Sequence, residues 1–351
     1  MSLRYSSPLL ALCVVITSLV VAAPVAAQSS DASRWVMPRT ADGHPDLQGN
    51  WTNVTMTPLQ RPRGQGPILE VETAAQREQA KADRITDRAK PSDPNRLAPP
   101  VGGDGSTGAA GGVGGYNTFY IDSGDNYAIY NGEIRSSLIV DPPDGRMPPR
   151  TEAAQQRQAE AGRLRRARGI GQYDNPENRP LAERCLKSFG SNAGPPMLPN
   201  GFYNNNYTIV QTGDHVMIMT EMVHDTRIIQ LGEPNRLPSH LSPWFGDSWG
   251  WWEGDTLVVE TVGLHPLQRG GGMHRGTTDE LKVTERFTRA DESTINYEFT
   301  VEDPSTFTAS YSGEVPFKRL DGLVYEYACH EGNYALFNVL SGARAQERGN
   351  N

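Results

Sequence analysis

The sequence lacks an excess of basic residues and, beyond its N-terminal segment, any long hydrophobic run. Its 33 Lys and Arg stand against 41 Asp and Glu, a net charge of -8 at pH 7. Neutralising phosphates requires a basic excess, so this balance argues against a nucleic-acid partner. A membrane-spanning helix needs about 20 consecutive apolar residues, so we expect no integral membrane contact.

The N-terminal segment itself has the features of a secretory signal peptide. Arg4 precedes the apolar run LLALCVVITSLVVAAP, and a stretch of small residues ends at Ala27. This order of charge, apolar core and small residues is the one that signal peptidase recognises. The sequence therefore predicts a signal peptide over residues 1–27, cut after Ala27, and a secreted, periplasmic chain.

Cysteine is also scarce, with three in the whole chain. Cys13 lies in the predicted signal peptide, which leaves Cys185 and Cys329. Disulfides persist outside the cytoplasm, and an even pair of cysteines there favours a bridge over two free thiols. We expect a Cys185–Cys329 disulfide, in which neither sulfur acts as a nucleophile.

Residues 28–200 form the first region of the mature chain. Two polar stretches rich in Ala, Gln, Glu and Arg predict exposed helices, one over 71–90 and one over 151–168 that Thr151 caps. Between them, a glycine-rich stretch without the lysine of GxxxxGK[ST] predicts a connector, and residues 117–140 predict a strand pair. An irregular strap with Trp35, Leu47 and Trp51 as anchors precedes both helices.

Residues 201–345 have the sequence pattern of β-structure. Short runs rich in Val, Ile, Thr and aromatics alternate with turn residues, as at Thr212-Gly213-Asp214 and Asp321-Gly322. About eight strands at this spacing, without helices that could connect parallel neighbours, predict an antiparallel barrel or sandwich. The last expected strand is GLVYEYACH.

Side chains alternate faces along a strand, which sorts the polar residues of these runs. In YEYACHEGNY, Glu326 and His330 share one face, and Cys329 lies on the other. If Cys329 forms its bridge outside the barrel, Glu326 and His330 point inward. Buried charges need partners, so these groups either form paired networks or line a wet cavity.

Histidine beside carboxylates is a natural acid–base combination near neutral pH. We expect His224 or His330 to move a proton and Glu298 or Glu326 to orient it, while Arg227 or Arg286 holds an oxyanion. Asp225 completes the catalytic set. No cofactor is expected, but His224 and His330 with a carboxylate would also suit a divalent metal, although the chain has no HxH or HExxH motif.

The tryptophans between residues 242 and 256 suggest the substrate-binding half of a site. Trp244, Trp249 and Trp251 fall in a predicted loop, where they either plug one end of the barrel or form an aromatic rim for a flat ligand. His274 lies in the following glycine-rich loop, which could close as a lid.

The chain resembles an uncharacterised family of secreted bacterial proteins. The resemblance lies in stretches such as PDLQGNW, HDTRII, WEGDTLVV and YEYACHEGNY, spread over nearly all of the mature chain. It implies a calycin-like or lipocalin-like barrel preceded by a partly helical segment, and it implies no particular reaction. His274 departs from the family pattern, which has an aromatic residue at that position.

These observations predict a secreted enzyme that uses His and carboxylate acid–base chemistry on a small cyclic or aromatic apolar molecule. Its class would be lyase, isomerase or hydrolase. The alternative is a periplasmic barrel that binds such a molecule without turnover. The sequence leaves the oligomeric state open.

Overall fold

The computed structural model describes residues 35–91, 95, 97, 121–169, 171–190, 192–270 and 272–349. The predicted signal peptide and glycine-rich connector lie outside the described residues. The chain divides into two compact units, Met1–Val36 and Met37–Asn351, and the second unit holds the helices and strands of the described ranges. None of these helices is long and apolar enough to cross a membrane.

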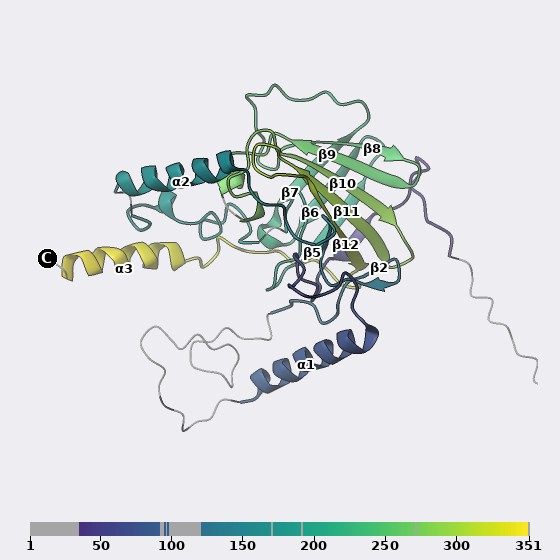
Figure 1. Cartoon of the computed structure of the whole chain (residues 1–351), viewed down its shortest axis with the longest axis horizontal. Helices are drawn as coiled ribbons and strands as arrows, with labels where there is room; N and C mark the ends of the chain where they lie inside the picture. Colours follow the sequence, from purple (N-terminus) through teal and green to yellow (C-terminus); the bar gives the residue numbers. More distant parts are fainter. Residues whose placement is uncertain are drawn as a thin grey trace, which may run out of the picture. The chain divides into compact units, whose positions relative to one another are not determined.

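The second unit is built on a closed β-barrel (Figure 1). Its strands follow one another around the barrel in sequence order, and the first pairs with the last through Trp51↔Arg319 and Thr52↔Lys318. The barrel prediction is confirmed. The strands are β1 Gly49–Thr52, β5 Asn206–Gln211, β6 His215–Thr220, β7 Thr226–Leu231, β8 Asp247–Glu253, β9 Thr256–Val262, β10 Lys282–Arg289, β11 Thr294–Glu302 and β12 Tyr311–Arg319.

One pair of neighbouring strands is parallel, where the sequence predicted antiparallel pairing throughout. Gln230 of β7 pairs with Trp249 of β8 in this parallel register. Parallel neighbours need a long crossover, and the connection from Gly232 to Gly246 is long enough to supply it without a helix. The barrel is therefore mixed rather than fully antiparallel.

Two strands of this sheet come from the region before residue 200. β1 closes the barrel, and β4 (Ile139–Asp141) pairs with β12 outside the ring. The strap anchors Leu47 and Trp51 are fully buried in the core, so this part of the strap belongs to the barrel, whereas the third expected anchor, Trp35, lies in the first unit. A separate hairpin of β2 (Ile129–Tyr130) and β3 (Glu133–Ile134) also lies here.

Both predicted helices are confirmed. α1 spans Val71–Ala89, and α2 spans Glu152–Ala167, where the Thr151 side chain accepts a hydrogen bond from the Ala154 amide at 3.1 Å. A third helix, α3 (Ala335–Gly349), was not predicted.

The strand expected over residues 322–330 is wrong, because the chain from Asp321 to Tyr334 has no regular structure. The preceding strand, β12, is already paired with β11, β4 and, at its end, β1. A segment that follows β12 therefore meets no adjacent sheet edge on which to form a further strand. Instead it leads to α3 as an irregular loop.

Side chains fill the interior of the barrel. Tyr207 stacks on Phe317 with ring centroids 5.1 Å apart, and Tyr297 packs against the same ring at 5.2 Å. All three side chains are fully buried. The core continues through aliphatic and aromatic residues of these and other barrel strands, among them Trp51, Ile209, Ile218, Ile229, Val259, Phe287, Phe299 and Val315.

Candidate functional site

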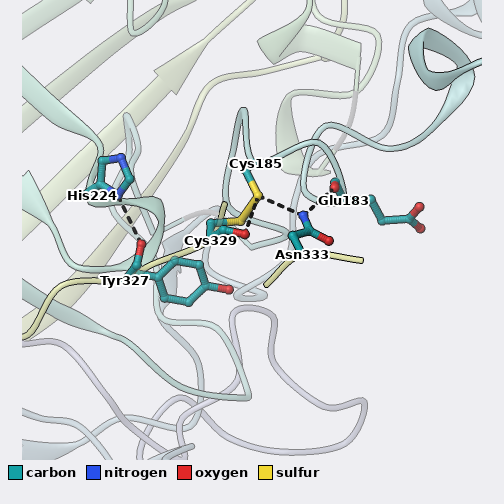
Figure 2. Close-up of a disulfide and its surroundings, with 6 residues drawn as sticks. All are labelled: Glu183, Cys185, His224, Tyr327, Cys329 and Asn333. Atoms are coloured by element: carbon teal, nitrogen blue, oxygen red, sulfur yellow. Dashed lines mark hydrogen bonds between the residues drawn. A yellow bond between two sulfur atoms is a disulfide. The ribbon is translucent and has the colours of Figure 1, made fainter. Parts of the chain in front are cut away.

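The predicted disulfide is present and joins two loops beside the barrel. Cys185 and Cys329 are bonded, with their Cα atoms 5.8 Å apart (Figure 2). Asn333 also reaches across this junction and donates hydrogen bonds to the Glu183 carbonyl and to the Cys185 sulfur. The segment YEYACHEGNY is therefore anchored through Cys329 rather than through strand pairing.

The inward placement expected for Glu326 and His330 is wrong. Both side chains are exposed to solvent, because their segment is an irregular loop without alternating faces. The loop contributes a backbone group instead: the Tyr327 carbonyl lies 3.2 Å from Nδ1 of His224 (Figure 2). A carbonyl only accepts, so Nδ1 carries the proton in this contact and Nε2 is the basic nitrogen of the neutral ring.

The run HVMIMTEMVH predicts a strand that reaches His224, but His224 lies in the turn over residues 221–225, between β6 and β7. Two consecutive non-glycine residues of this turn have left-handed backbone angles, Val223 at φ 64° and His224 at φ 45°. This region costs a β-branched residue such as valine about 1–3 kcal/mol, and such strain concentrates at functional sites. Hydrogen bonds from Thr220 N to Asp225 O at 2.8 Å and from His224 N to Glu221 O at 3.1 Å hold the turn.

Asp225 closes this turn with a carboxyl group that lacks a full set of partners. Its Oδ2 atom is buried and accepts no hydrogen bond from the described residues. Burial raises the pKa of Asp225 from 3.8 to about 7, and the nearby His224 and Lys187 oppose the shift only in part. Near neutral pH, this carboxyl group is therefore present in both its protonated and ionised forms.

Lys187 is a neighbour of Asp225 that sequence reasoning missed. Its ammonium group donates to the Gln268 carbonyl at 3.1 Å, burial lowers its pKa, and Asp225 opposes that shift. The sequence offered one signal: Lys187 follows Cys185 by two residues, so the disulfide fixes its backbone close to the loop 325–333.

His274 lines a small cavity together with Lys187 and is buried. Its Nε2 atom is 2.6 Å from the Pro195 carbonyl, so Nε2 carries the proton, and Nδ1 has no partner among the described residues. Burial lowers the pKa of His274 to about 4, so the ring is neutral at pH 7. The cavity between His274 and Lys187 measures about 10 Å³, which is too small for an organic ligand.

Lys187, His224, Asp225 and His274 are hereafter called the Asp225 cluster. Its members are placed by loops that the disulfide, the β6–β7 turn and the Pro195 carbonyl hold together. Of its residues, His224 and Asp225 were expected to be catalytic, and His274 was expected to bind substrate. His274 contributes as a buried polar group instead.

The remaining charged candidates form pairs away from the Asp225 cluster. Arg227 points into the barrel and forms a bidentate pair with Glu285, at 2.5 and 2.9 Å, to which Tyr297 also donates at 2.8 Å. Both members of this pair are buried, so the paired-network alternative holds for Arg227. It is not available to hold a substrate.

Glu298 and Arg286 lie on the outer face of the barrel. Tyr130 donates a hydrogen bond to Glu298 at 2.6 Å, and Arg286 forms an ion pair with Glu253 at 2.9 Å. Their strands alternate as expected, with Glu285 buried and Arg286 partly exposed. Because side chains alternate along a strand, both residues point away from the barrel interior and cannot contribute to a site there.

The predicted aromatic rim is divided among separate contacts. Trp249 and Trp251 belong to β8 rather than to a loop, and their indole N–H groups donate to Asp247 and Glu253 at 3.1 and 3.0 Å. Trp244 packs against His265 with ring centroids 5.0 Å apart. The three tryptophans therefore serve local packing around β8.

Ser248 occupies the centre of GDSWG, whose letters match the GxSxG pattern of a nucleophile elbow. That pattern acts at a sharp turn between a strand and a helix, whereas Ser248 lies inside β8. Its hydroxyl group is buried and lies 2.8 Å from the Thr261 hydroxyl. The match therefore does not create an activated serine.

Within the described residues, no group of three or more His, Cys, Asp or Glu side chains is arranged to hold a metal ion. Comparison of the sequence with protein-family models and with curated proteins finds no match. The functional proposal therefore relies on the fold and on the geometry of the Asp225 cluster.

Proposed function

We propose that the protein is a secreted enzyme in which the Asp225 carboxyl group transfers protons to and from a small cyclic or aromatic substrate. The reaction class would be isomerisation, elimination or hydrolysis. The observation that carries the proposal is the carboxyl group itself, with a pKa of about 7 and a buried oxygen that accepts no hydrogen bond from the described residues.

A general base works best when its pKa lies near the operating pH, because it is then both available and basic enough. An ordinary exposed aspartate, with a pKa near 3.8, is a much weaker base. Perturbed carboxyl groups of this kind are concentrated at active sites, as are strained turns. Asp225 combines both features in one turn.

The neighbours of Asp225 supply the complementary groups. His224 is exposed, and its ring is oriented by the Tyr327 carbonyl, which suits Nε2 for a second proton transfer. Lys187 provides a positive charge that would stabilise an oxyanion developing on the substrate. Together the three residues support removal of a proton at one position and its return at another.

The packed barrel interior favours this enzyme over a barrel that carries a ligand in its lumen. Calyx-type binding needs an internal cavity, and in this protein Tyr207, Tyr297 and Phe317 occupy the centre of the barrel. Substrate would approach from the solvent side of the β6–β7 turn, where His224 is exposed.

Proton exchange tests this proposal with a probe that need not be the natural substrate. The probe is 2-tetralone, a small cyclic aromatic ketone, whose α-protons exchange in D₂O and are followed by proton NMR at neutral pH. We expect the unsubstituted protein to accelerate exchange over buffer, and Asp225→Asn to lower that acceleration about 100-fold, a typical loss for a general base.

The matched control is Asp214→Asn, which removes an exposed carboxylate from the neighbouring β5–β6 turn and should leave exchange unchanged. Circular dichroism verifies that both variants are folded. Equal exchange by Asp225→Asn and the unsubstituted protein, or no acceleration by either, would contradict the proposal.

A further inference from the structure

A groove of about 560 Å³ has no residue of the Asp225 cluster in its lining, although it shares Gly190 with the small cavity between Lys187 and His274. It is bordered by Thr55–Leu59, which follows β1, by Lys81 of α1, and by the segment Leu198–Gly201. Its volume falls within the range of about 300–1,000 Å³ that small-molecule sites occupy. None of its lining residues takes part in the proposed proton transfer.

The groove lining is partly polar and partly apolar, and its apolar part is called the floor below. Leu138 and Leu198 line it, and both belong to the hydrophobic core, with 1% and 3% of their surface exposed. Met56, Pro58 and Leu59 add apolar surface along one side. A flat apolar ligand would cover this surface and release the water above it, which is favourable.

Lys81 gives the groove its charge, since it is the only charged residue among the described residues that line it. Its ammonium group donates to the Ser123 hydroxyl at 2.9 Å and to the Gly124 carbonyl, both of which are neutral acceptors. Lys81 also forms an ion pair with Asp125 at 4.0 Å, through a side chain that is 81% exposed, and Asp122 acts on its charge as well. A bound carboxylate would therefore replace the exposed Asp125 as the anionic partner of Lys81.

Two further cations lie on the same face of α1. Arg84 and Arg88 follow Lys81 by three and seven residues, the spacing of one helix face, and all three line an adjoining pocket of about 170 Å³. Desolvation lowers the pKa of Lys81, and a bound anion would offset that cost. This end of the groove therefore favours an anionic group.

An exposed aromatic cluster is formed by residues that are next in the sequence to two groove-lining glycines. Phe189 and Phe202 directly precede and follow Gly190 and Gly201, which line it. The two phenylalanine rings meet edge to face with centroids 5.6 Å apart, and they leave 47% and 48% of their surfaces exposed. Tyr203 packs on both. Such exposed aromatic groups mark surfaces that contact ligands with rings.

We propose that this groove binds a small aromatic or alicyclic carboxylate, with its ring on the apolar floor and its carboxylate at Lys81. Lys81 recognises the charge, and the floor and aromatic cluster recognise the ring. The proposal does not depend on catalysis by Asp225, because it concerns binding at different residues.

Isothermal titration calorimetry with two probes tests the proposal. One probe is 2-naphthoate, and the other is 2-naphthalenemethanol, which has the same ring system without a charge. We expect the protein to bind 2-naphthoate at least about tenfold more tightly, as a charged hydrogen bond predicts. Lys81→Met keeps the apolar stem of the side chain and should abolish this preference, whereas Lys81→Arg should retain it.

Lys90→Met is the matched control, because Lys90 follows the same helix and pairs with Asp87 instead of lining the groove. It should leave the preference intact. Phe202→Ala should weaken the binding of both probes to a similar degree. Equal affinity of the protein for the two probes, no binding of either, or an unchanged preference in Lys81→Met would overturn the proposal.

Discussion

Asp225 and His274 are two buried titratable residues that make the stability of the protein depend on pH in opposite directions. The pKa of Asp225 is raised from 3.8 to about 7, so folding carries the cost of an ionised buried carboxylate above pH 7 and loses that cost as pH falls toward 3.8. The pKa of His274 is lowered from 6.5 to about 4. The unfolded chain therefore gains a proton between pH 6.5 and 4 that the folded chain does not, and stability is lost across that window.

Because these two effects offset each other between pH 6.5 and 4, a substitution is needed to separate them. Asp225→Asn removes the charge and keeps the shape, so it should stabilise the protein at pH 8 by about 2 kcal/mol, and by no more than about 4. Urea unfolding at pH 8 and at pH 4.5 measures the difference, which should shrink at the lower pH. A stability change of the same size at both values would contradict the raised pKa.

At the scale of elements, sequence reasoning succeeded where the period of the backbone was regular. The run over Lys282–Arg289 was expected as a strand and forms one, and Thr151 marked the start of α2, whereas Arg286 was expected in the site and lies on the outer face. The alternation of faces in YEYACHEGNY misled, because it presupposes a strand and the segment has no sheet edge beside it. The cluster around Asp225 was only half predictable, since Lys187 and Asp225 meet through loops far apart in the sequence.

The disulfide is the main covalent tie of the segment that leads from β12 to α3. Replacing Cys185 and Cys329 together by Ser should lower the free energy of unfolding by about 2–4 kcal/mol. Hydrogen exchange should show lost protection at residues 325–349 and little change in β10 and β11, because those strands are paired on both sides. Unchanged exchange in the segment would show that other contacts hold it.

The same double substitution should also free His224 from the Tyr327 carbonyl, since that contact depends on the loop. The acceleration of 2-tetralone exchange should therefore fall in this variant while the barrel stays folded. A full exchange rate in the variant would separate the orientation of His224 from the disulfide.

At the scale of the whole molecule, barrel closure joins parts of the chain that lie far apart in sequence. β1 ends the ring by pairing with both β5 and β12, and Trp51 is its buried residue, flanked by the guanidinium groups of Arg289 and Arg319 at 4.9 and 5.7 Å. Composition predicted the barrel, but it could not indicate that a short strand before α1 would complete it. Short strands carry too few residues for a periodic signal.

Trp51→Ala tests how far the barrel depends on this closure. Loss of a fully buried tryptophan should lower the free energy of unfolding by about 3–5 kcal/mol, measured by urea denaturation. Trp251→Ala, at a partly exposed tryptophan of β8, is the control and should cost less. Similar losses for both would indicate that β1 contributes little to the cooperative fold.

The proposed function depends on the ionisation of Asp225, which carbon NMR measures directly. The ¹³Cγ resonance of Asp225, assigned by its disappearance in Asp225→Asn, should titrate with a midpoint near pH 7, the value to which burial raises its pKa. Titration near pH 3.8, as for an exposed aspartate, would contradict the assignment of Asp225 as the acid–base group.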